Sequence, residues 1–182
     1  MEQLLDKKIN NPLRRFLCMV RVVLGGTFEY LHAGHSRLVE EAFKILKTSG
    51  GGIIHIGLTS DKMAAGKSHS VSNYDTRKQI LTDFISEVIQ ALELPEDCYL
   101  ILELEDSFGP SVSGNYDYIV VSPETRVGAD KINEVRRKNG LAPLQIIEVE
   151  FVLAEDTIPI SSTRIYNGEI DKEGRVRRGG QN

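Results

Sequence analysis

Apolar positions along the chain fall into short continuous runs and longer segments with helical spacing. The runs Cys18–Leu24 and Ile53–Leu58 are nearly uninterrupted, which is typical of parallel strands buried on both faces. Between them, apolar residues recur at intervals of three and four over His35–Lys47, which predicts an amphipathic helix that ends at the glycines 50–52. This order of strand, helix and strand predicts a βαβ unit.

The same alternation continues to the end of the chain. We expect a loop with a short helix at 59–72, a long amphipathic helix ending before Pro95, strands at Tyr99–Leu104, Tyr118–Val121 and Gln145–Val149, and helices opening at Ser122 and near Ser161. The pattern predicts a doubly wound, Rossmann-like α/β fold with a parallel sheet of about five strands and helices on both faces. Ligands of such sheets bind beyond the carboxyl ends of the strands, so the site is sought in the loops that follow them.

Length and composition are those of an ordinary globular protein. The chain has 182 residues, of which 41% are hydrophobic and 26% are charged. This predicts one domain over 1–182, with a core at about 18–170 and frayed termini at 1–15 and 175–182.

The net charge and the cysteine content indicate which binding partners and which cellular compartment to expect. Lysine and arginine number 22 and aspartate and glutamate 26, so the net charge is −4, which argues against a nucleic-acid partner. We find no apolar segment that predicts a secretory leader or a membrane span. Cys18 and Cys98 fit neither a disulfide framework nor a zinc site, so we expect free thiols and a cytoplasmic protein.

The loop after the first predicted strand has the features of an anion site. It reads GGTFEYLHAGH from Gly25 to His35, and Gly25 and Gly26 let the backbone approach a ligand closely. The amides at the start of the next helix can hold a phosphate. His35 and Arg37 in that first turn oppose the helix dipole by about 0.3–1 kcal/mol each unless an anion lies in front of them.

The last predicted helix opens in the same unusual way. A capping box would place Glu or Gln three residues after the Ser161 cap, but Arg164 stands there. Together with Ser162 and Thr163 it forms a candidate phosphate clamp. The alternative is an ordinary serine cap with an arginine that faces solvent, and the presence of two such helix entrances in one chain favours the clamp.

The loop after the second predicted strand offers further cations. Gly66-Lys67-Ser68 imitates the end of a Walker A motif, but Asp61 stands where that motif needs glycine, so we reject a P-loop. Lys62 and Lys67 are candidates for a substrate phosphate, although either can be a surface lysine. Arg77 lies near the start of the following helix.

The sequence lacks the residue patterns that zinc-dependent and serine-dependent hydrolases require. No cysteine or carboxylate completes a zinc set with His32 and His35, and no G-x-S-x-G sequence provides a serine nucleophile. We therefore expect neither a metal hydrolase nor a serine hydrolase, and we assign no metal ligands.

The glycine-rich loop and the serine-containing helix start together resemble the motifs of a known family. GGTFEYLHAGH at 25–35 and ISSTRI at 160–165 resemble the paired signatures of the HxGH nucleotidyltransferase superfamily. The stretches 56–62, 117–131 and 160–174 further resemble phosphopantetheine adenylyltransferases of the archaeal and eukaryotic type. The resemblance implies adenylyl transfer from ATP to 4′-phosphopantetheine, giving dephospho-coenzyme A and pyrophosphate, with Mg²⁺ accompanying the nucleotide.

The resemblance also implies roles for individual residues. His35 would contact the α-phosphate, His32 would bind neighbouring phosphate oxygens, and Thr27 would align the reacting phosphates. Lys62, supported by Arg77, is our preferred ligand for the acceptor phosphate. The expected binding residues are Gly25, Gly26, Thr27, Phe28, His32, His35, Lys62, Arg77 and, for the β- and γ-phosphates, Ser161, Ser162, Thr163 and Arg164.

Two alternatives stay open at this point. The chain could be a sister nucleotidyltransferase whose acceptor is nicotinamide mononucleotide or flavin mononucleotide. It could also be a nucleotide-binding module without turnover. The sequence does not decide between a monomer and a homo-oligomer.

Overall fold

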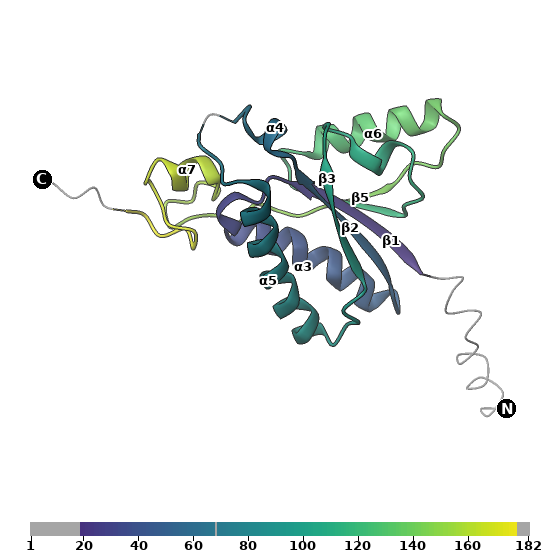
Figure 1. Cartoon of the computed structure of the whole chain (residues 1–182), viewed down its shortest axis with the longest axis horizontal. Coiled ribbons are helices and arrows are strands. Elements are labelled where there is room, and N and C mark those ends of the chain that lie inside the picture. Colours follow the sequence, from purple (N-terminus) through teal and green to yellow (C-terminus); the bar gives the residue numbers. More distant parts are fainter. Residues whose placement is uncertain (1–18, 68, 178–182) are drawn as a thin grey trace, which may run out of the picture.

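Five parallel strands form the centre of the structure (Figure 1). The computed structural model describes residues 19–67 and 69–177. The strands are β1 (Val20–Gly26), β2 (Gly52–Thr59), β3 (Tyr99–Leu104), β4 (Tyr118–Val121) and β5 (Gln145–Glu148). Their order in the sheet is β3-β2-β1-β4-β5, so the winding reverses between β1 and β4. This confirms the predicted doubly wound sheet and places its switch point.

Helices cover both faces of the sheet. The described helices are α3 (Ala33–Thr48), α4 (Asp61–Ala64), α5 (Tyr74–Leu92), α6 (Arg126–Lys138) and α7 (Ser162–Tyr166), with 3-10 turns η1 (Glu29–Leu31) and η2 (Gly109–Val112). The larger core joins α3 and α5 to alternate residues of β1 and β2, such as Leu24 and Ile56. A smaller core joins α6 to the opposite face through Val23, Ile119 and Ile132. Within the described residues, no helix is both long and apolar enough to cross a membrane.

Two helices begin at other residues than the sequence predicted. Helix α3 begins at Ala33 because the His32 carbonyl already accepts hydrogen bonds from the N–H groups of His35 (2.8 Å) and Ser36 (3.1 Å). Helix α6 begins at Arg126 and not at Ser122. The Thr125 N–H donates to the Ser122 carbonyl (3.0 Å) and the Ser122 N–H donates to the Thr125 hydroxyl (3.1 Å), which closes a separate turn before the helix.

The C-terminal segment returns to the start of α3. Ala154, Ile160 and Ile170 form a small core against Ala33, whose N–H donates to the Lys172 carbonyl (3.3 Å). The C-terminal segment therefore lies at the same edge of the sheet as the loop after β1, where Figure 1 shows α7 beyond the strands.

The tail was expected to fray from residue 175, but residues 175–177 are held in place. The Arg177 N–H donates to the Glu169 carbonyl (2.9 Å), and Ile170 and Val176 form an antiparallel bridge. Residues 1–15, Cys18 and residues 178–182 lie outside the described residues, so our expectations for them stay predictions. Cys98 directly precedes β3 and is buried.

Candidate active site

A cavity of about 690 Å³ opens at the carboxyl edge of the sheet, around the switch point. Its walls come from the loops after β1, β2, β3 and β4, from residues 149–152 after β5 and from the start of α7. Of the predicted binding residues, those that line it are Gly25, Gly26, Thr27, His32, His35, Ser161, Ser162 and Thr163. Among the described residues, Phe28, Lys62, Arg77 and Arg164 are not part of this lining.

The turn after β1 has an unusual backbone. Phe28, Tyr30 and Leu31 have φ angles of 52°, 63° and 38°, in the left-handed region that residues with a Cβ rarely adopt. Each such residue costs on the order of 1–3 kcal/mol, so tertiary contacts must hold the turn. One of them is the Phe28 ring, which is fully buried and packs against the His35 ring with centroids 5.2 Å apart. The Phe28 side chain therefore supports His35 from behind the cavity.

Glycines in the motif make room for rings. A Cβ on Gly26 would come within 3.2 Å of the Phe28 ring, and a Cβ on Gly34 would come within 3.1 Å of Cε1 of His32. The glycine between the two histidines thus leaves room for the His32 ring, which a Cβ at this position would crowd. The sequence had pointed only to close approach by a ligand.

The two histidines form a stacked pair on the cavity wall. Their ring centroids lie 3.9 Å apart and the planes differ by 21°. The Nδ1 atoms of both rings are buried and have no hydrogen-bond partner among residues 19–67 and 69–177. The buried Nδ1 atoms are therefore not the ones that a ligand in the cavity would meet.

Burial keeps both imidazoles uncharged near neutral pH. Desolvation lowers the pKa of His32 to about 4. Desolvation, with smaller contributions from the neighbouring His32 and Lys67, lowers the pKa of His35 to about 3. At pH 7 each ring can donate a neutral N–H to an anion, and a bound phosphate would raise both pKa values.

Arg77 is a buried cross-link between loops. Its side chain is 1% exposed. The guanidinium donates to the carbonyls of Ser72 (2.8 Å), Thr27 (3.2 Å) and Thr59 (2.9 Å) and to the Asp61 carboxylate (2.9 Å). It therefore fixes the loops after β1 and β2 to each other and to the start of α5.

Arg164 is held in a network next to α7. Its guanidinium donates to Glu169 (3.0 Å), to the carbonyls of Ile158 and Pro159 (both 3.2 Å) and to Asp156. The hydrogen bond that Arg164 donates to the Asp156 carboxylate raises the pKa of Arg164 above its ordinary value. The predicted Ser161 cap is present, because its hydroxyl accepts from the Arg164 N–H (3.4 Å).

The structure separates the two candidate lysines. Lys67 lines the cavity, and its charge contributes to the lowered pKa of His35. Lys62 lies in α4 with an exposed side chain, outside the residues that line the cavity.

Comparison with known proteins decides the family. The sequence model of the cytidylyltransferase-like family matches residues 23–168. A phosphopantetheine adenylyltransferase from Methanosarcina acetivorans is 51% identical over 163 residues, which cover 90% of this chain and 99% of that protein. The chain belongs to the phosphopantetheine adenylyltransferase family.

Other similar proteins agree with the assignment to the phosphopantetheine adenylyltransferase family. A phosphopantetheine adenylyltransferase from Archaeoglobus fulgidus is 40% identical over 86% of this chain and 99% of its own length. A crystal structure of a protein of unknown function from the same organism matches 71% of this chain and 89% of that chain, with a TM-score of 0.60 and 33% identity. The tyrosyl-tRNA synthetase of that organism, at 14% identity and a TM-score of 0.54, shares the fold alone.

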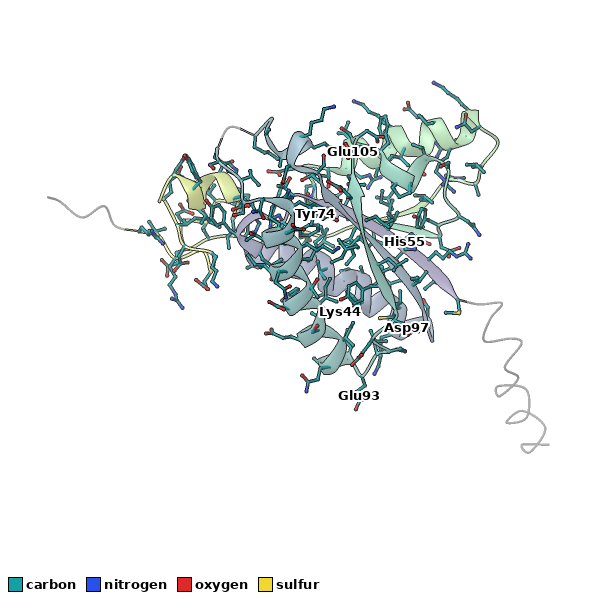
Figure 2. All side chains as sticks on the ribbon, viewed as in Figure 1. Lys44, His55, Tyr74, Glu93, Asp97 and Glu105 are labelled. Carbon is teal, nitrogen blue, oxygen red and sulfur yellow. The ribbon has the colours of Figure 1, made fainter. Side chains whose placement is uncertain are left out.

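Several residues of this adenylyltransferase site were not predicted from the sequence. Glu29 is 5% exposed, and its carboxylate accepts hydrogen bonds from the Ser72 N–H and hydroxyl, both at 2.9 Å. His55 lines the cavity from the middle of β2, and its Nδ1 lies 2.7 Å from the Tyr116 hydroxyl. Figure 2 labels His55 on the sheet, and because His55 lines the cavity, the cavity extends back along the sheet from its carboxyl edge. Spacing alone gave no signal for these contacts, because they join distant segments.

Two of the carboxylates that line the cavity, those of Glu29 and Asp106, already have partners within the protein. Both Glu29 oxygens are taken by Ser72, and Asp106 accepts from the N–H groups of Phe108 (2.8 Å) and Gly109 (2.7 Å). Within the described ranges, no group of three or more metal-ligating side chains gathers. Mg²⁺ prefers phosphate oxygens and water as ligands, so an ion that enters with a nucleotide would need no cluster of protein carboxylates.

Proposed function

We propose that this chain transfers the adenylyl group of ATP to 4′-phosphopantetheine, giving dephospho-coenzyme A and pyrophosphate in coenzyme A biosynthesis. Membership of the phosphopantetheine adenylyltransferase family supports the reaction. The observation that links this reaction to particular residues is the shared cavity wall, which His32 and His35 line together with Ser161 and Thr163.

ATP lies across this wall in our proposal. The neutral Nε2–H of His35 donates to the α-phosphate, and that of His32 donates to neighbouring phosphate oxygens. The hydroxyls of Ser161 and Thr163 hold the β- and γ-phosphates. The Ser162 hydroxyl already donates to the Glu29 carbonyl (3.0 Å), so Ser162 ties α7 to the turn after β1.

The acceptor phosphate is held by Lys67, with Thr27 aligning the two reacting phosphates. An oxygen of the acceptor phosphate attacks the α-phosphorus, the bond from that phosphorus to the bridging oxygen breaks, and pyrophosphate leaves. The acceptor is already an anion near neutral pH, so no strong base is needed. Alignment and stabilisation of the charge that develops at phosphorus then supply the catalysis.

Residues outside the cavity lining position the residues that line it. Arg77 holds the Thr27 carbonyl, and Phe28 supports the His35 ring. Arg164 binds the segment 156–159 to α7, so we propose that it orients Ser161 and Thr163 without contacting phosphate.

We propose that Mg²⁺ enters with ATP and is bound through phosphate oxygens and water. When bound, it neutralises part of the triphosphate charge. The protein contributes the phosphate contacts described above and no dedicated carboxylate cage.

The test is product formation by the full chain. ATP is incubated with 4′-phosphopantetheine, nicotinamide mononucleotide or flavin mononucleotide in parallel, pyrophosphate is measured, and products are identified by mass spectrometry. We expect dephospho-coenzyme A from the first acceptor and background release with the others. A reaction with a mononucleotide acceptor alone would contradict the proposal. ATP binding without turnover on any acceptor would also contradict it.

Substitution of His35 tests the role of this residue. His35→Ala is expected to lower kcat by about 100-fold or more while ATP affinity changes much less, because the contact strengthens as charge develops. Equal losses in affinity and in kcat would exclude this role. His69→Ala, a ring on the same cavity wall, is the comparison variant.

A further inference from the structure

We propose that Glu29 is a positioning residue, whose buried carboxylate sets the pose of the histidine pair relative to the other phosphate-binding segments. This inference rests on the proposed adenylyl transfer and adds a residue to it. Glu29 lies between Phe28 and Tyr30, at the centre of the left-handed turn after β1. Its side chain is buried against the loop that precedes α5.

Hydrogen bonds through Glu29 form a closed ring. Its two carboxylate oxygens accept from the Ser72 hydroxyl and N–H, each at 2.9 Å. The Ser72 carbonyl accepts from Nε of Arg77 (2.8 Å), and Nη1 of Arg77 donates to the Thr27 carbonyl (3.2 Å). Thr27 is joined to Glu29 through one intervening residue. The ring thus holds both ends of the segment 27–29 against the start of α5.

A second connection leads from Glu29 to the C-terminal helix. The Ser162 hydroxyl donates to the Glu29 carbonyl at 3.0 Å. Both predicted phosphate-binding segments, the histidine turn and the start of α7, are therefore fastened to the same residue. A shift of Glu29 moves the two segments relative to each other.

The backbone of the turn explains why an anchor is needed. Phe28, Tyr30 and Leu31 have positive φ angles, so the turn stores strain that local interactions do not relieve. His32 follows directly, and its carbonyl begins α3 by accepting the His35 N–H (2.8 Å). Release of the Glu29 carboxylate would let the turn relax toward ordinary angles, and the imidazoles would move with it.

The carboxylate of Glu29 can be tested by its removal and by a close analogue. Its oxygens accept from the N–H and the hydroxyl of Ser72, and that hydroxyl can itself accept a hydrogen bond. In Glu29→Gln, the amide oxygen can accept from the Ser72 N–H while the NH₂ donates to the Ser72 hydroxyl oxygen, so both contacts can be kept. Glu29→Ala removes both. Because both carboxylate oxygens are already occupied, Glu29 does not serve as a phosphate ligand.

The experiment compares Glu29→Ala and Ser72→Ala with Glu87→Ala, at an exposed glutamate on α5. A misplacement of about 1 Å lowers turnover by about 10- to 100-fold, and this is the expected loss of kcat in Glu29→Ala, whereas Glu29→Gln should retain most of the activity. The KM values for both substrates should stay within about threefold, because the contacting groups remain present. Ser72→Thr retains the hydroxyl and should recover most of the activity that Ser72→Ala loses.

A readout in the free protein separates this proposal from the reaction itself. The imidazole NMR signals of His32 and His35 should shift in Glu29→Ala and Ser72→Ala and stay in place in Glu87→Ala. Unchanged imidazole signals in the Glu29→Ala variant would overturn the positioning role whether or not the wild type shows turnover. If Glu29→Ala fails to fold, the Ser72 pair of variants decides by the same two measurements. A wild type without turnover, but with shifted signals in the variants, would refute only the proposed reaction.

Discussion

Protonation of the stacked histidines should weaken the folded state as the pH falls. Burial lowers the pKa of His32 to about 4, whereas an unfolded chain has an ordinary histidine pKa of about 6.5. Between these two values the unfolded chain binds a proton that the folded chain refuses. The contribution of His32 to the free energy of unfolding is therefore fully present above pH 6.5, and it is lost as the pH falls toward 4.

The magnitude follows from the difference in pKa. At about 1.4 kcal/mol for each pKa unit, the full difference corresponds to about 3 kcal/mol for His32. Between pH 7 and pH 5 only the part below 6.5 counts, which is about 2 kcal/mol. This is a measurable part of the 5–15 kcal/mol, roughly, by which proteins of ordinary stability are folded.

Urea unfolding at pH 7 and pH 5 tests this for the wild type and for His32→Gln. The variant has no imidazole at this position to protonate, so its stability should fall by about 2 kcal/mol less than that of the wild type over the same range. If both proteins lose the same stability between the two pH values, His32 is not held neutral by burial. The proposed neutral N–H donor would then be wrong.

Three further substitutions test the site. Lys67→Ala should raise KM for 4′-phosphopantetheine by about tenfold or more because a charge-assisted contact is lost, and equal kinetics in Lys62→Ala and Lys67→Ala would contradict this assignment. Gly34→Ala places a Cβ about 3.1 Å from the His32 ring, so kcat should fall by about tenfold, and a variant with wild-type kcat would show that the ring can move freely. Arg77→Met leaves buried carbonyl partners without their donor, so urea unfolding should show a loss of about 1–3 kcal/mol, and an unchanged midpoint would contradict the cross-link.

The sheet and most of its helices could be predicted because their signals are local. Buried parallel strands read as apolar runs, and α3 and α5 show apolar residues at helical spacing. The start of α6 could not be predicted in this way, because Ser122 and Thr125 suit both a helix entrance and the separate turn that they form.

The site was predictable as far as its backbone segments, and less so for its charged side chains. The histidine motif and the serines of α7 line one cavity because parallel strands end at one edge. A cation near a helix start carries no information about its partners. Arg77 and Arg164 are bound to protein acceptors instead, and Glu29 is buried by a loop more than 40 residues away in sequence.

The central claim is that the histidine turn and the start of α7 hold one triphosphate together. A crystal structure with a non-hydrolysable ATP analogue and 4′-phosphopantetheine tests it most directly. We predict the α-phosphate at Nε2 of His35, the β- and γ-phosphates at Ser161 and Thr163, and the acceptor phosphate at Lys67. A nucleotide that contacts the histidines but leaves the hydroxyls of α7 in water, or the reverse, would contradict the account.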